Sequence, residues 1–97
     1  MSKFETVEIA RNEWQSDGTP TVNNRWTCES ETDALDRAHI RSVEATIQGR
    51  TDVHFEARED GRPIDRAGWE VPEDDVVFQS LAEMGYTEEE ILSALGC

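Results

Sequence analysis

The amino-acid sequence predicts an α+β fold: a small antiparallel sheet of β-β-α-β order, with room for a fourth short strand, covered by one helix and followed by a C-terminal two-helix tail. Three observations predict it. Apolar residues alternate with period two over residues 4–29 and again over residues 51–57. They recur at helical spacing over residues 31–48 and beyond residue 72. The length of 97 residues fits one small unit with a modest core.

The first two predicted strands cover residues 4–14 and 21–29. Val7 and Ile9 lie between acidic residues in the first, which indicates one buried face. Apolar residues at even spacing share a face of the second: Val22, Trp26 and Cys28. Residues 16–20 are rich in turn-forming types, so the two strands form a hairpin.

The predicted helix begins after Ser30, which suits the N-cap position, and Asp33 can reach back to it as in a capping box. The helix ends near Gln48, before Gly49. A third strand follows from residue 51 to 57. The Asp60-Gly61 dipeptide then predicts a hairpin turn into a short return strand that begins near Ile64.

We expect residues 1–65 to form the β-β-α-β domain, residues 66–72 a linker and residues 73–97 a helical hairpin. Gly85 ends the first tail helix, and Thr87 with Glu90 forms a capping box for the second. The tail then packs beside the first helix or swaps onto a second chain.

The net charge of −13 comes from 22 acidic and nine basic residues, and Lys3 is the one lysine among the basic ones. Such a composition resembles proteins of haloarchaea, because molar salt shortens the screening length to about 3 Å and relieves self-repulsion. An acidic mimic of nucleic acid is the alternative explanation. No apolar run suits a signal peptide or a membrane span, so we expect a cytoplasmic protein with no membrane partner.

The cysteines and histidines show no metal-binding spacing, and no phosphate-binding loop is present. We therefore expect no cofactor, no metal, no catalytic residues and no enzymatic activity. The least favoured alternative is a small hydrolase or thiol enzyme that pairs Cys28 with His39 or His54.

Tryptophan and arginine cluster in the hairpin sequence. Trp14 and Trp26 flank its loop and could face each other, with Trp26 otherwise a core residue. Aromatic side chains with arginines can hold a single-stranded base. A nucleic-acid-associated regulator is therefore our second functional hypothesis, and its residues are Arg11, Trp14, Arg25, Arg37 and Arg41.

Residues 81–95 resemble the first two helices of a ubiquitin-associated (UBA) domain, and Met84-Gly85-Tyr86 matches the Met-Gly-Phe/Tyr loop of that family. The resemblance implies binding of a ubiquitin-like protein through this loop. The same residues also fit a generic helix-turn-helix pattern, with a glycine stop and a capping box. Residues 4–65 are similar to small β-β-α-β domains of unknown function in bacteria and archaea.

The leading hypothesis is a non-enzymatic protein-interaction or regulatory accessory module adapted to high salt. Its partner is another protein or a second copy of the chain, and we expect a homodimer. Exposed tryptophan is enriched at protein interfaces, so we count the linker tryptophan among the partner-binding residues together with those of the tail. The predicted partner-binding residues are Trp69, Met84, Gly85, Tyr86 and Leu95.

Overall fold

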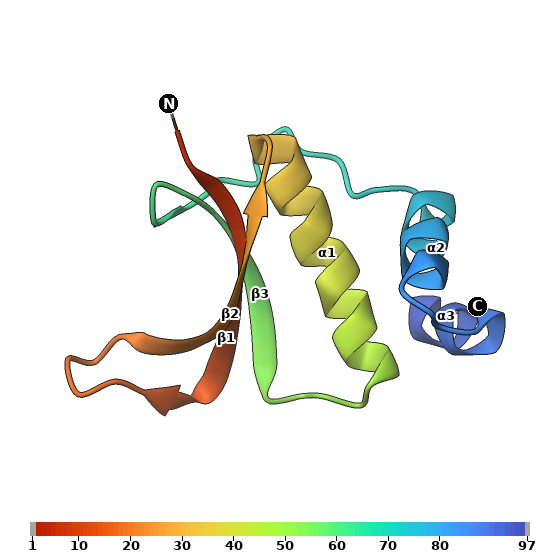
Figure 1. Ribbon diagram of the computed structural model, residues 1–97, viewed down its shortest axis with the longest axis horizontal. Coiled ribbons are helices and arrows are strands. Elements are labelled where there is room, and N and C mark those ends of the chain that lie inside the picture. The colour runs from red at the N-terminus through yellow and green to blue at the C-terminus, as the bar shows by residue number, and fades with distance from the viewer. Residues whose placement is uncertain (1, 97) are drawn as a thin grey trace.

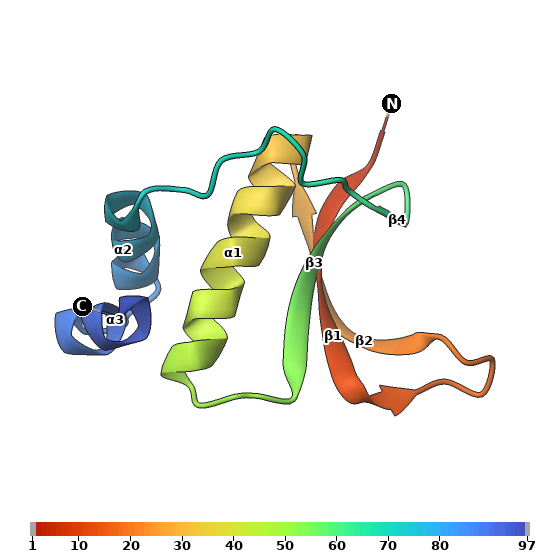
Figure 2. The ribbon, with the colours of Figure 1, turned by 180° about the vertical axis from the view of Figure 1, so that it is seen from behind.

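The computed structural model describes residues 2–96 and confirms the α+β class. Its elements follow in the order β1 (Phe4–Trp14), β2 (Pro20–Cys28), α1 (Glu31–Ile47), β3 (Val53–Glu59), β4 (Arg62–Pro63), α2 (Asp74–Glu83) and α3 (Glu88–Leu95). They form three layers: α1 lies against one face of the sheet, and α2 and α3 lie on the far side of α1 (Figures 1 and 2).

The sheet has four strands in the order β2-β1-β3-β4, and neighbouring strands are antiparallel. Because β2 and β3 both pair with β1, they run parallel to each other, and α1 is the crossover that parallel strands require. The pairing of β1 with β2 slips by one residue at Asn23, which forms a bulge opposite Glu8 and Ile9. Beyond it the hairpin tip curls away from α1 (Figure 1).

The central place of β1 corrects the expectation that this strand buries one face. Residues from Glu5 to Ala10 are all buried, on both faces of the sheet. Thr6 Oγ1 donates a hydrogen bond of 2.8 Å to the Ala34 carbonyl of α1, so even-numbered residues face the helix. Local alternation cannot show that a strand has neighbours on both sides, which is why the acidic residues of β1 were expected at the surface.

The predicted ends of α1 are confirmed. Ser30 Oγ accepts from the Asp33 amide at 3.1 Å, and the Asp33 carboxylate accepts from the Glu29 amide rather than from that of Ser30. Gln48 caps the C-terminus, and Gly49 follows with a φ of +72° that favours glycine.

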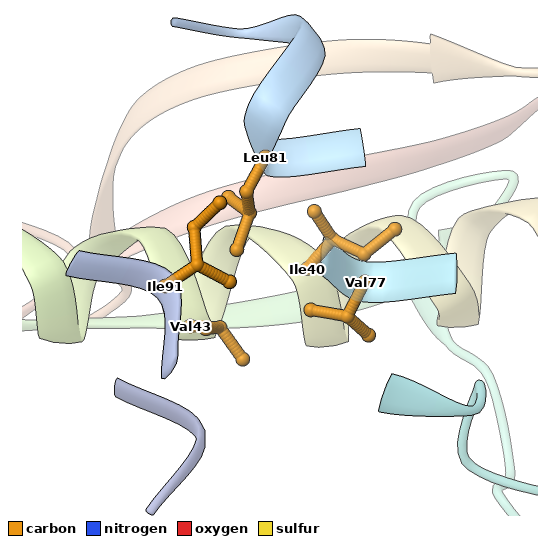
Figure 3. Close-up of a cluster of buried hydrophobic side chains, with 5 residues drawn as sticks. All are labelled: Ile40, Val43, Val77, Leu81 and Ile91. Carbon is orange, nitrogen blue, oxygen red and sulfur yellow. The ribbon is translucent and has the colours of Figure 1, made fainter. Parts of the chain in front are cut away.

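Helix α1 is buried on two sides. Small residues, Ala34, Ala38 and Ala45, let it approach the sheet closely, where they pack with Phe55, Ala57 and their neighbours. On its other side, Ile40 and Val43 meet three residues that are fully buried: Val77, Leu81 and Ile91 (Figure 3). This contact fixes the tail on α1 of its own chain.

The tail and the return strand agree closely with the sequence pattern. Both hydrogen bonds of the predicted capping box between Thr87 and Glu90 are present in α3. The fourth strand is also confirmed, but it covers Arg62–Pro63 and ends before Ile64, which instead packs beside Cys28 and Ala34. The division of the chain at residues 66–72 stays a prediction.

Candidate functional site

The arginines and tryptophans of the nucleic-acid hypothesis do not gather at one place. Trp14 is 64% exposed at the hairpin tip, where it pairs with Pro20, whereas Trp26 lies opposite Thr6 and packs on the α1 side of the sheet. The two tryptophans therefore lie at different levels of the hairpin and do not face each other.

Three of these arginines are engaged with carboxylates at separate positions. Arg25 pairs with Glu5 at 3.1 Å on the sheet face that α1 leaves open, and Arg37 pairs with Asp33 at 3.1 Å on α1. Arg41 pairs with Glu44 at 3.0 Å, and its guanidinium lies 4.3 Å from the centroid of the Trp26 ring. None of the three is directed at Trp14.

The predicted partner-binding residues divide into two groups. Trp69 Nε1 donates to Asp36 Oδ1 at 2.8 Å, and its ring is partly buried against the Leu35 cluster, so it fastens the linker to α1. Tyr86 and Leu95 pack against the α1–α2–α3 cluster, and the Tyr86 hydroxyl donates to Glu44 Oε2 at 2.8 Å.

The other two partner-binding residues reach the surface. Met84 is 42% exposed, and Gly85 is exposed with a φ of +103°. Of the loop that resembles the UBA motif, only these two residues are freely accessible.

Cys28 lies inside the fold, where its thiol contacts Thr6 Oγ1 and the Trp26 carbonyl at 3.6 Å each. Within residues 2–96, no hydrogen bond joins this thiol to either histidine. His39 and His54 lie elsewhere, at a groove that the sequence did not reveal.

This groove, here named the α1–β3 groove, lies between α1, the outer edge of β3 and the linker, and has a volume of about 510 Å³. Five basic side chains line it: Arg11, His39, Arg50, His54 and Arg66. They include both histidines of the chain. In the described part of the chain, no aspartate or glutamate is among the lining residues, although the net charge is −13. The groove is therefore an acid-free region on an acidic molecule.

One arginine of the groove, Arg50, is paired with a buried carboxylate. Arg50 forms two parallel hydrogen bonds to the Glu8 carboxylate, of 3.1 and 3.0 Å, and Glu8 is only 3% exposed. Burial by itself raises the pKa of Glu8, but hydrogen bonds from Arg50 and Asn23 outweigh it and hold this pKa below its usual value of 4.5. Glu8 thus stays ionised and anchors Arg50 at the end of α1.

The other two arginines keep their charge available. Arg11 Nε donates to the Val53 carbonyl at 3.1 Å, and the Arg66 guanidinium lies 5.8 Å from the centroid of the Trp69 ring. Both side chains are exposed, and neither pairs with a carboxylate among residues 2–96. An anionic group that enters the groove would meet these two cations first.

The outer edge of β3 forms the other boundary of the groove. The short β4 pairs with Arg58 and Glu59, and the Ile64 amide that follows it donates to the Ala57 carbonyl, so the edge from Val53 to Glu56 has no strand beside it in the part of the chain described. The sequence missed this site because its residues come from four distant segments. The one available signal was the alternation that predicts β3, which says nothing about an unpaired edge.

Comparisons with known proteins give no match: no family model fits the chain, and no curated protein or solved structure is similar to it. Both resemblances drawn from the sequence therefore stay predictions. Among the described residues, no three side chains of the metal-binding types are placed to share an ion. None of the described helices combines the length and apolar character needed to cross a membrane.

Proposed function

We propose that this chain is a non-enzymatic interaction module that binds a partner protein in the α1–β3 groove. One observation carries the proposal: both histidines and three arginines line a groove that has no acidic lining residue, on a chain with a net charge of −13. Within residues 2–96, a second hollow without acidic lining residues contains Arg25 and Arg58, but these pair with Glu5 and Glu56, so the α1–β3 groove offers an anionic partner the arginines that are not already paired.

Direct contact between charges matters if the protein works in molar salt, as its composition leads us to propose for a salt-rich cytoplasm. At 1 M salt the screening length is about 3 Å, so long-range attraction is lost and only charges in direct contact still attract. Arg11 and Arg66 can make such contacts, because a guanidinium binds a carboxylate through two parallel hydrogen bonds.

Neutralising the groove tests the proposal. We expect Arg11→Gln combined with Arg66→Gln to weaken partner binding by about tenfold or more, since two charge-assisted contacts are lost. The measurement is quantitative co-purification from cells that make the protein, in molar KCl, followed by titration of the captured partner. The matched control, Arg37→Gln with Arg62→Gln, changes the net charge equally outside the groove. Equal binding by the groove variant and the control would refute the proposal.

The same experiment decides about nucleic acid. A nucleic-acid-associated regulator would be captured with bound DNA or RNA, and its binding would fall when Arg25, Arg37 or Arg41 is replaced, whereas replacing Arg66 alone would leave it unchanged. Because these three arginines already pair with carboxylates, we place this function second.

High-salt adaptation carries its own prediction. We expect the melting temperature to rise as KCl increases from dilute buffer to molar concentration, because screening relieves repulsion among the acidic residues. Each 1 kcal/mol of relieved repulsion raises Tm by about 4–8 °C in a domain of this size. The check is a thermal melt by circular dichroism, with sucrose as the uncharged control. A chain fully folded in dilute buffer with an unchanged Tm would favour the nucleic-acid mimic instead.

A further inference from the structure

The floor of the α1–β3 groove is the backbone edge of β3. The groove touches Val53, His54 and Phe55 in succession. Val53 and Phe55 are buried toward α1, whereas His54 is exposed, as expected for strand residues that point to opposite faces in turn. A hollow that touches all three therefore runs along the strand edge.

The hydrogen-bonding direction of this edge follows from its neighbours. The Asp52 carbonyl accepts from the Arg11 amide at 2.8 Å on the β1 side, and the Ala57 carbonyl accepts from the Ile64 amide at 2.9 Å on the opposite side. Backbone groups alternate between the two sides in an antiparallel sheet. The N–H groups of Val53 and Phe55 and the carbonyl of Phe55 thus point into the groove.

Both ends of the edge are closed. Arg11 Nε already holds the Val53 carbonyl, and Ile64 with β4 covers the edge from Ala57 onward. An unpaired edge normally invites pairing with other chains, and proteins restrict it by such means. Here only the short stretch around Phe55 remains open.

The walls indicate which strand fits this stretch. Ala38 and Ala45 on the α1 side are already packed against Val53 and Phe55, so the apolar surface open to an incoming side chain comes from Trp69 and from Val71, which is 57% exposed. Basic side chains surround the groove, and Arg11 and Arg66 are its arginines without an acidic partner within residues 2–96. We propose that the α1–β3 groove takes an extended acidic segment of a partner protein, in which apolar and acidic residues alternate, and that this segment adds to the sheet as a strand beside β3.

This inference rests on the proposed function and deepens it. Backbone hydrogen bonds supply affinity that salt does not screen, and the arginines select the acidic residues. A free phosphate or a nucleic acid would use the arginines alone and would leave the Phe55 backbone untouched, so the backbone distinguishes the occupants.

The test uses the full chain in molar KCl with a short synthetic peptide in which valine and glutamate alternate. We expect amide hydrogen exchange at Val53 and Phe55, followed by NMR, to slow by about tenfold or more when the peptide binds. The amides of His54 and Glu56, which face β1, serve as internal controls and keep their exchange rates. The same peptide is prepared with alternate backbone amides N-methylated, in both registers. The register that methylates the amides facing β3 is expected to bind about tenfold more weakly, and the other register should bind like the parent peptide.

The outcomes separate this inference from the proposed function. If the peptide binds and Arg11→Gln with Arg66→Gln abolishes binding, but exchange at Phe55 is unchanged, strand addition is wrong while the groove proposal stands. If inorganic phosphate or a thymidine oligonucleotide binds and the peptide does not, the acidic segment is wrong. If sedimentation shows two copies joined through β3 without peptide, the occupant is a second copy and the inference is overturned.

Discussion

Replacing Leu81 with alanine is expected to lower the free energy of unfolding by about 3 kcal/mol. Leu81 is fully buried between α2 and α1, where it packs in the cluster that also contains Ile40 and Ile91. The substitution removes apolar contacts and leaves a cavity among α1, α2 and α3. Urea unfolding followed by circular dichroism measures the effect at fixed salt.

Val76→Ala is the matched control for this prediction. Val76 lies on the same helix but is 50% exposed, so its truncation should change stability by less than about 0.5 kcal/mol. A similar loss for both variants would mean that burial in the cluster does not set the effect of Leu81, because alanine is the better helix former at both positions. A second, earlier transition in Leu81→Ala would show that the tail detaches before the sheet unfolds.

The elements of this fold were predictable because each is encoded locally. The capping residues Ser30 and Thr87 and the alternation over Val53–Ala57 act within a few residues, and the structure reproduces them. The hairpin register was not predictable in this way. The register shifts twice, at Asn23 and again between Ile9 and Trp14, so Trp14 meets Pro20 near the loop, while Trp26 lies opposite Thr6.

The candidate site was invisible for a related reason. Arg11, Arg50 and Arg66 lie in separate segments, and only the packing of α1 on β3 brings them to one groove. The residues that sequence patterns favoured were mostly structural: Tyr86 and Leu95 pack against the core cluster, and Trp69 secures the linker. Aromatic and apolar patterns report where a chain is buried, whereas a groove depends on which surfaces tertiary packing leaves open.

The second large effect concerns the buried carboxylate of β1. Glu8→Gln keeps the shape of the side chain but removes the charge that Arg50 and Asn23 recognise, so we expect a loss of about 2 kcal/mol at neutral pH. Because the folded-state pKa of Glu8 lies below its usual value of 4.5, ionised Glu8 stabilises the fold above the unfolded-state pKa. That contribution disappears as the pH falls through the folded-state pKa. The difference between wild type and variant in urea unfolding should therefore be full near neutrality and shrink below pH 4.5.

Arg50→Met separates pairing from burial as the origin of this effect. Without Arg50, Glu8 remains buried with only Asn23 and Asn24 as side-chain hydrogen-bond donors, so burial dominates and its pKa should rise above 4.5. The sign of the linkage then reverses: the folded state binds the proton more tightly, and the variant regains stability as the pH falls toward 4.5. Wild type loses the Glu8 contribution on acidification, while Arg50→Met recovers part of its deficit. If the stability difference between Arg50→Met and wild type does not change with pH, the ion pair with Arg50 is not what keeps Glu8 ionised in the fold.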